Sequence, residues 1–140
     1  MSNMKLIGEA ARNSSRRLAM EPGSVRNDAI SCIGDKILEN LDSILEANSE
    51  DVIRAKKNGL TEASVDRLLL TEDRLKSMVD DIRNVISLQD PLGVTFDTKN
   101  MPNGLQVGKK RVPLGVIGVI YESRPNVTVD VSVLCIKSGN

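Results

Sequence analysis

The sequence contains no histidine and no tryptophan, one phenylalanine, one tyrosine and two cysteines. Without histidine, zinc sites of the Cys/His type and histidine-based catalytic triads are excluded. The scarce aromatic surface disfavours the stacking of nucleobases. Cys32 and Cys135 lie in apolar segments without a neighbouring base that would form a thiolate. We therefore expect both to be buried core residues rather than nucleophiles, with no metal bound.

The chain also lacks an excess of charge and a long apolar run. Nineteen basic residues balance nineteen acidic ones, so no net field attracts nucleic acid or an anionic membrane. Of its 140 residues, 40% are hydrophobic and 27% are charged, which is typical of a globular protein. No signal peptide or membrane-spanning stretch is recognisable. We expect a cytoplasmic protein that binds small molecules or copies of itself.

Apolar residues recur at helical spacing through roughly the first ninety residues. The first helix is predicted over residues 3–20 and ends before the Pro-Gly pair at 22–23. Ser24 is the predicted cap of a second helix, whose apolar face continues towards Leu45.

Further helix signals follow. Ser49, which precedes two acidic residues, is the predicted cap of a third helix that ends at the Asn-Gly pair 58–59. A short helical turn is predicted at 65–70. Thr71 opens the clearest helix, which the Asp-Pro pair at 90–91 should stop.

The hydrophobic period changes to two from Gly93 onward. Val94 and Phe96 alternate with polar residues, as do Leu105 and Val107, and the segment PNG at 102–104 provides a turn. The pattern predicts a polar two-stranded ribbon, which is marginally stable on its own in water.

The most informative segment is PLGVIGVIYESRPN, residues 113–126. Its apolar residues 116–120 predict a strand covered on both faces, and Gly115 and Gly118 allow another backbone or a ligand to approach. Polar groups then gather at the carboxyl end of this strand, where open α/β sheets bind cofactors. The conventional Gly-x-Gly-x-x-Gly fingerprint is absent.

This segment, extended to VPLGVIGVIYESRPNVTVD (112–130) and LCIKSGN (134–140), resembles the glutamate-5-semialdehyde dehydrogenases, or γ-glutamyl phosphate reductases, of the aldehyde dehydrogenase superfamily. Weaker similarity lies at 58–71, 90–93 and 102–105. Members of this family are several times longer and carry their nucleophilic cysteine beyond the segment present here. The chain is similar to an amino-terminal portion.

The resemblance implies an α/β fold with N-terminal helices, a β-ribbon arm, and the first strand, loop and helix of a Rossmann-type cofactor domain. It divides the chain into a helical part (1–92), an oligomerisation arm (93–112) that pairs with another subunit, and the start of an NADP-binding core (113–140). Strict alternation of valines at 127–133 favours a strand. The resemblance instead implies a helix there, which we adopt.

The implied activity is NADPH-dependent reduction of L-glutamyl 5-phosphate to L-glutamate 5-semialdehyde and phosphate in L-proline biosynthesis. The family's cysteine attacks the acyl phosphate, expels phosphate and leaves a thioester that accepts hydride. Because this chain lacks that segment, we expect it to be inactive alone. The alternative is a non-catalytic remnant or oligomerisation module that pairs through residues 94–112. An autonomous small-ligand binder is disfavoured because no complete phosphate cradle is present.

The resemblance also implies site residues. Asn126 is the expected oxyanion donor, although asparagine is equally suited to cap the following helix. Arg124 is the rival donor, or a clamp for a carboxylate or phosphate of the substrate. The expected cofactor contacts are Tyr121, Glu122, Ser123, Pro125 and Lys137. For Lys137 the alternative is a solvated surface lysine.

Overall fold

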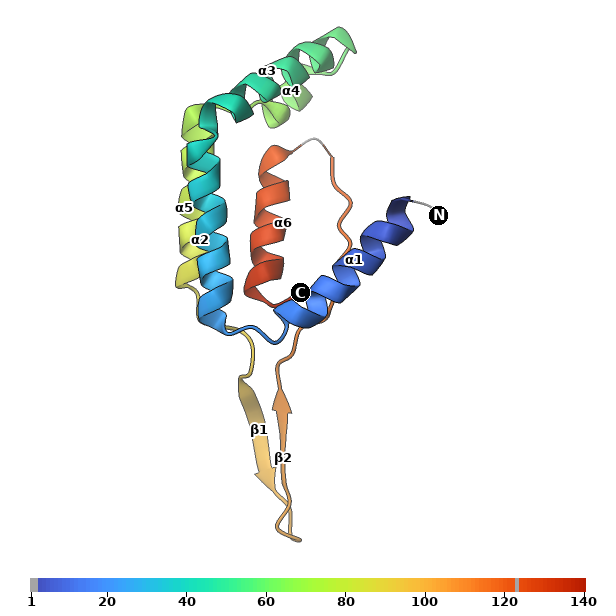
Figure 1. Ribbon diagram of the computed structural model, residues 1–140, viewed down its shortest axis with the longest axis vertical. Helices are drawn as coiled ribbons and strands as arrows, with labels where there is room; N and C mark the ends of the chain where they lie inside the picture. Colours follow the sequence, from blue (N-terminus) through green and yellow to red (C-terminus); the bar gives the residue numbers. More distant parts are fainter. Residues whose placement is uncertain (1–2, 123) are drawn as a thin grey trace.

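The computed structural model describes residues 3–122 and 124–140. Within them the chain forms α1 (Asn3–Leu18), α2 (Gly23–Glu39), α3 (Leu41–Lys57), α4 (Glu62–Leu68), α5 (Glu72–Ser87), β1 (Thr95–Asn100), β2 (Gln106–Lys110) and α6 (Pro125–Lys137). Figure 1 shows a helical body from which the two strands project as a long hairpin. The predicted combination of amino-terminal helices and a β-ribbon is confirmed.

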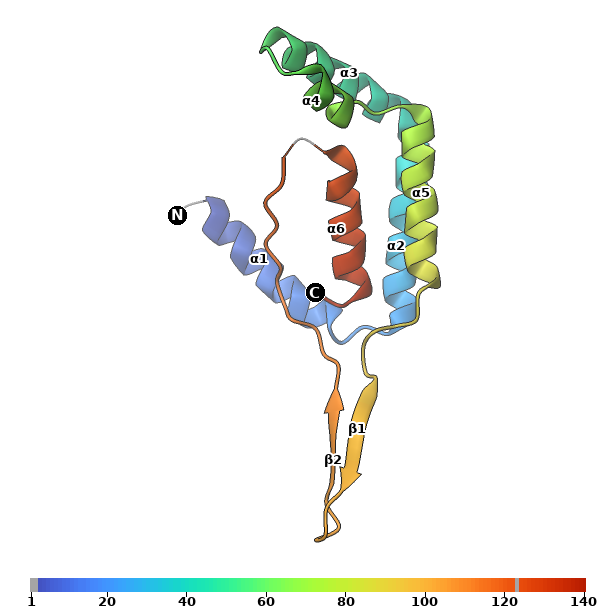
Figure 2. The same ribbon diagram turned by 180° about the vertical axis from the view of Figure 1, so that it is seen from behind.

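The core lies between three helices. Helices α2, α5 and α6 run side by side (Figures 1 and 2), and each contributes one residue to the buried centre: Ile30, Ile82 and Val133. Burial of such side chains stabilises the fold by roughly 1.5–3 kcal/mol each. Because α6 belongs to the predicted segment 113–140, this core joins it to the segment 1–92. The division of the chain into these segments stays a prediction.

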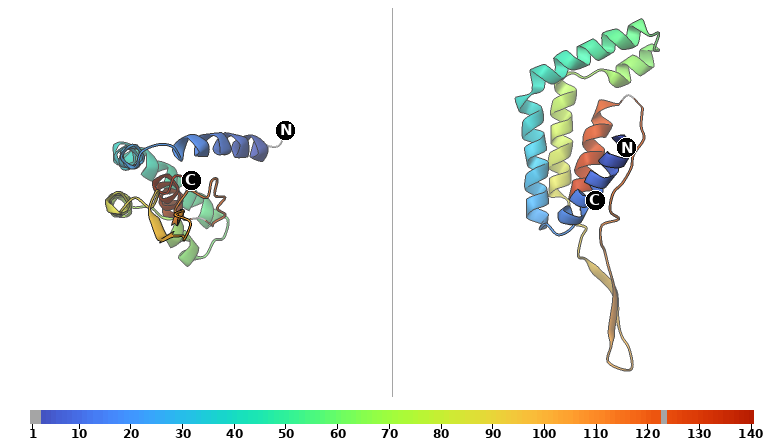
Figure 3. Two further views of the ribbon diagram at one scale, coloured as in Figure 1. Left: turned by 90° about the horizontal axis from the view of Figure 1, so that it is seen from below. Right: turned by 45° about the vertical axis from the view of Figure 1, so that its right-hand side comes forward.

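Helix α1 stands apart from this core. None of its residues is buried, and it extends away from the other helices (Figure 3). Its apolar side chains Met4, Leu6 and Ile7 are all exposed. In the described part of the chain, no helix is both long and apolar enough to cross a membrane.

Two predicted helix ends are confirmed by their caps. The hydroxyl of Thr71 accepts a hydrogen bond from the backbone N–H of Arg74 at 3.2 Å, as expected of an N-cap. Helix α3 ends at Lys57 with Asn58 as its C-cap, and the next residue, Gly59, adopts a φ of 77°. This left-handed conformation favours glycine, which has no Cβ to clash.

Two predicted caps are wrong. Ser24 lies inside α2, which begins at Gly23, and the N-cap position is occupied by Pro22. Ser49 lies in the middle of α3. The chain breaks instead at Asn40, whose side-chain amide donates to the carbonyl of Lys36 at 2.8 Å. The same carbonyl also accepts the backbone N–H of Asn40 at 3.2 Å, and the added side-chain bond favours a turn there, so serine does not decide the boundary.

The ribbon has the predicted antiparallel pairing. Thr95 pairs with Lys110, Asn100 pairs with Gln106, and an irregularity lies between Phe96 and Lys99. At the tip, Gly104 has a φ of 84°. Every residue of β1 and β2 is exposed. The ribbon therefore has no hydrophobic cover within this chain.

The strand predicted at residues 116–120 does not form within this chain. Residues 111–122 have no regular secondary structure, and their apolar side chains, such as Ile120, are exposed. A strand needs a hydrogen-bonded neighbour, and the segment runs beside α6 and α1 without one (Figure 2). The helix predicted after it is confirmed, since α6 spans all four valines of 127–133.

Both cysteines are less buried than predicted. Cys32 is exposed and Cys135 is half-buried. Each residue of a helix advances the side-chain direction by about 100°. Cys32 is two positions from the buried Ile30, so it points to the opposite side of α2 and away from the core.

Candidate functional site

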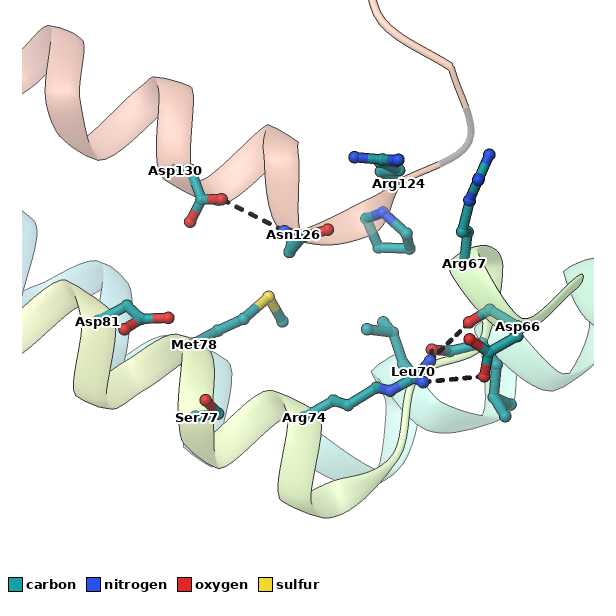
Figure 4. Close-up of a pocket in the computed structure, with 12 residues that line it drawn as sticks. Asp66, Arg67, Leu70, Arg74, Ser77, Met78, Asp81, Arg124, Asn126 and Asp130 are labelled. Atoms are coloured by element: carbon teal, nitrogen blue, oxygen red, sulfur yellow. Dashed lines mark hydrogen bonds and ion pairs between the residues drawn. The ribbon is translucent and has the colours of Figure 1, made fainter. Parts of the chain in front are cut away.

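A cavity of about 360 Å³ lies between α5 and α6, next to α4. Its size falls in the range of small-molecule sites. Figure 4 shows the side chains around it. It is lined by Asp66, Arg67, Leu69, Leu70, Arg74, Ser77, Met78, Asp81, Arg124, Pro125, Asn126 and Asp130.

One wall of the cavity is held by Arg74. Its guanidinium donates to the carboxylate of Asp66 at 2.9 Å and to the carbonyls of Asp66 and Leu69 at 2.6 and 2.7 Å. These bonds connect α5 to α4 and the segment after it. Because its donors are engaged in this way, Arg74 shapes the cavity rather than offering a free charge.

Asn126 and Asp130 form the opposite wall. They are four residues apart on α6, and the amide of Asn126 donates to the Asp130 carboxylate at 3.3 Å. The alternative that Asn126 caps α6 is wrong, because Arg124 occupies the cap position and no side-chain cap bond forms. Asn126 thus presents its amide to the cavity (Figure 4).

Arg124 borders two cavities. Besides the one described, it lines an open cavity of about 730 Å³, together with Arg67, Tyr121 and Glu122. The segment before α6 therefore contributes a cationic side chain to both. Figure 4 shows the guanidinium groups of Arg124 and Arg67 at one end of the first cavity, away from Asp81.

The other predicted cofactor residues are distributed around these cavities. Pro125 lines the first and is the first residue of α6. Tyr121 lies beside the second, and its hydroxyl is 2.6 Å from that of Thr128. Glu122 lies beside the second cavity as well. Ser123 lies outside the described residues.

Lys137 is placed differently. It is 6% exposed, and its ammonium donates to the side chain of Asn27 and to the carbonyl of Ile86, both at 2.8 Å. The alternative of a solvated surface lysine is therefore wrong. Lys137 ends α6, about 20 Å along the helix from the loop that begins it. Its donors connect α6 to α2 and α5 and do not face either cavity.

Several polar residues of the first cavity were not singled out from the sequence. Arg74, Ser77 and Asp81 recur at three- and four-residue intervals along α5, as Asn126 and Asp130 do on α6. This periodicity was visible in the sequence. That the two polar stripes face each other depends on the packing of α5 against α6, which their spacing does not reveal.

The resolved pKa shifts lie outside the cavities. A hydrogen bond and the charge of Lys76 lower the pKa of Glu72, and Glu72 in turn raises the pKa of Lys76. Hydrogen bonding and the charge of Glu39 raise the pKa of Lys36. All three groups are on the surface of helices.

Comparison with known proteins gives a consistent result. A scan against protein-family models found no match. A gamma-glutamyl phosphate reductase of Photobacterium profundum is 46% identical over 138 residues, covering 99% of this chain and 33% of that protein. One from Shewanella piezotolerans is 50% identical over 143 aligned residues, covering 100% and 34%.

Solved structures agree. The gamma-glutamyl phosphate reductase of Thermotoga maritima superposes with a TM-score of 0.91 at 42% identity, over 94% of this chain and 32% of that one. The Saccharomyces cerevisiae enzyme gives 0.94 at 35% identity, over 100% and 36%. The chain thus spans about one third of the length of these relatives. In sequence and in fold, it resembles the amino-terminal portion of the gamma-glutamyl phosphate reductase family.

Proposed function

We propose that this chain is part of a cytoplasmic reductase that converts L-glutamyl 5-phosphate into L-glutamate 5-semialdehyde and phosphate for L-proline biosynthesis. The observation that carries the proposal is the match of 46% identity over 99% of the chain to a gamma-glutamyl phosphate reductase. The matched residues cover 99% of the chain and so include the loop and helix that hold Arg124 and Asn126.

The residues of the loop fit the binding of NADP(H) in part. Two of the expected contacts, Tyr121 and Glu122, border the open cavity of about 730 Å³. Lys137 does not fit, because its ammonium is buried against Asn27 and Ile86. When bound, NADPH supplies the hydride. This chain contributes residues that orient the cofactor.

Within the reaction, Asn126 supplies the oxyanion donor. Its amide borders the cavity between α5 and α6 and is held by Asp130. Preorganised donors of this kind stabilise the charge that develops in acyl transfer, and removing one costs about 10²–10³ in kcat. Arg124 is the rival donor or the clamp for an anionic group of the substrate.

The chain alone is expected to be inactive, because the reaction needs a thiolate at the cavity. Neither Cys32 nor Cys135 borders the cavity between α5 and α6. The nucleophile would come from the part of the reductase that this chain does not span.

The ribbon is proposed as an oligomerisation arm over residues 94–112. Its strands are exposed throughout and leave the helical body. Exposed strand edges are ready templates for pairing. Removing residues 97–108 shortens the ribbon. In the 140-residue chain this deletion should leave the circular dichroism signal of the helices unchanged. In the full-length reductase it should give a smaller assembly by light scattering.

A chimera tests the activity. This chain would replace the matching third of the Shewanella piezotolerans relative, and the product would be expressed in a proline auxotroph that lacks its own reductase. We expect growth without proline from the chimera and none from the 140-residue chain alone. The variant Asn126→Ala should reduce kcat of the chimera by about 10²-fold or more.

The second candidate is a non-catalytic remnant or oligomerisation module. The observation in its favour is the exposure of both the ribbon and the apolar residues 112–121. An inactive chimera that still assembles into oligomers would favour this candidate over the reductase.

A further inference from the structure

The cavity between α5 and α6 contains charges of both signs, and their arrangement is the basis of a further inference. Asp81 on α5 and Asp130 on α6 contribute carboxylates, whereas Arg67 and Arg124 contribute guanidinium groups. In Figure 4 the two aspartates lie at one end of the cavity and the two arginines at the other. A ligand that fits both ends carries a cation and an anion.

These four charges are not consumed by ion pairs with one another. Among the described residues, the ion pair in the cavity wall joins Arg74 to Asp66. Asp130 accepts one bond from the neutral amide of Asn126. For Asp81, Arg67 and Arg124, no ion pair is found within residues 3–122 and 124–140. Two carboxylates and two guanidinium groups are thus free to meet a ligand.

The neighbouring carboxylate of α5 shows the contrast. Asp80 is adjacent to Asp81 in sequence but pairs with Arg83 at 2.7 Å on the exposed side of the helix. Successive side chains of a helix point about 100° apart. Both side chains are exposed, but Asp81 lines the cavity beside α6 and Asp80 does not, so the two form a matched pair for mutagenesis.

The chemistry of the cavity selects among ligands. A phosphate or a dicarboxylate without an amine would meet Arg67 and Arg124 favourably but would be repelled by Asp81 and Asp130. An α-amino acid has an ammonium and a carboxylate on the same carbon and satisfies both ends with charge-assisted bonds. Met78 supplies an apolar surface for the side-chain methylene groups of the amino acid (Figure 4).

We propose that this cavity binds the amino acid end of the substrate, with Asp81 and Asp130 on the α-ammonium group and Arg124, supported by Arg67, on the α-carboxylate. The inference rests on the proposed function and adds its specificity. The enzyme would distinguish an aminoacyl phosphate from a plain acyl phosphate through α5 and α6. Asp81, Asp130 and Arg124 would then be binding residues that determine KM.

The test uses the 140-residue chain, because the lining residues all belong to it. Calorimetry or NMR titration would compare L-glutamate with glutarate, which lacks the amine, and 4-aminobutyrate, which lacks the α-carboxylate. We expect L-glutamate to bind about tenfold or more tightly than either, since one charge-assisted contact of about 1.4 kcal/mol is worth a factor of ten. Equal binding of all three, or no saturable binding of L-glutamate, would overturn the proposal.

Variants assign the two ends. Asp81→Asn should weaken L-glutamate binding about tenfold and leave glutarate unaffected or improved, whereas Arg124→Gln should weaken both. Asp80→Asn is the matched control and should change neither, because its carboxylate pairs with Arg83. If Asp81→Asn affects L-glutamate no more than Asp80→Asn does, the carboxylate end is wrongly assigned.

The chimeric reductase separates this inference from the proposed function. If it is active, Asp81→Asn should raise KM for L-glutamyl 5-phosphate about tenfold with little change in kcat. An active chimera whose KM does not respond would leave the reductase function intact and overturn the binding site. If the chimera is inactive but the 140-residue chain binds L-glutamate selectively, the binding site is supported and the reductase function is overturned.

Discussion

Lys137 is the residue whose role the structure changes most. Its ammonium joins three helices, because it lies at the end of α6 and donates to Asn27 on α2 and to Ile86 on α5. Replacing it by methionine leaves two acceptors without a partner. We expect Lys137→Met to lower the free energy of unfolding by about 1–3 kcal/mol in urea denaturation followed by circular dichroism. Lys5→Met, at an exposed position of α1, should have no effect.

The contrary outcome is informative as well. Suppose that Lys137→Met leaves the free energy of unfolding of the chain unchanged, and that the same substitution weakens NADPH binding by the chimera. The cofactor role implied by the family resemblance would then be supported. The structural role would then be wrong.

A second prediction at this scale concerns the exposed pair Glu72 and Lys76, whose side chains are 2.6 Å apart on α5. Since the pKa of Glu72 is lowered in the folded chain, the pair contributes stability above the unfolded pKa of that carboxyl and loses it as pH falls through the folded pKa. Lys76→Met should therefore raise the pKa of Glu72 in an NMR titration. An unchanged pKa would mean that the pair does not persist in solution.

The sequence predicted the residues that lie at a cavity better than it predicted the hydrogen-bond partners of each residue. The loop residues Arg124 and Asn126 do border a cavity. The two partners of Lys137, Asn27 and Ile86, lie 110 and 51 residues away, and no local pattern encodes those contacts. Cys32 was assigned to the core from its apolar neighbours, but a shift of two positions on a helix is enough to turn a side chain outward.

At the scale of elements, periodicity predicted the helices well because each has one apolar face. It failed at the boundary between α2 and α3, where the apolar pattern continues across Asn40 and the break depends on a local side-chain bond. It also predicted the ribbon. It could not predict whether residues 116–120 pair, because pairing requires a neighbouring strand, and residues 3–122 and 124–140 provide none for them.

The three-helix core supplies the prediction for this scale. Ile82 of α5 is 3% exposed and contacts the cluster that includes Ile30 and Val133. Ile82→Ala should lower the free energy of unfolding by about 2–5 kcal/mol, through lost burial and the cavity left behind. Ile53→Ala on α3 is the matched control, because that side chain is 64% exposed. Equal effects of the two changes in urea denaturation would contradict a core between α2, α5 and α6.

At the scale of the whole molecule, the chain exposes a run of apolar side chains on its surface. Its apolar side chains at 116–120 are exposed, Ile120 fully so, while Val116 and Ile117 also border a cavity beside α1 and α6. The backbone of Leu114 and Gly115 is held by the side chain of Asn140, at 2.6 and 2.9 Å, so the beginning of the segment is fixed beside the end of α6. A fixed, doubly apolar segment is suited to become an inner strand.

The chain spans about one third of the length of its relatives, and we predict that this segment pairs with a strand from the part that it does not span. We expect the chain, mixed with a polypeptide comprising the remaining two thirds of the Shewanella piezotolerans relative, to elute with it as one complex in size-exclusion chromatography. Ile120→Asp should prevent this association without destabilising the isolated chain, because Ile120 makes no buried contact there. Ile53→Asp, an equally drastic change at an exposed isoleucine of α3, should leave the complex intact. If both variants associate equally well, residues 116–120 are not the surface through which the rest of a reductase completes this fold.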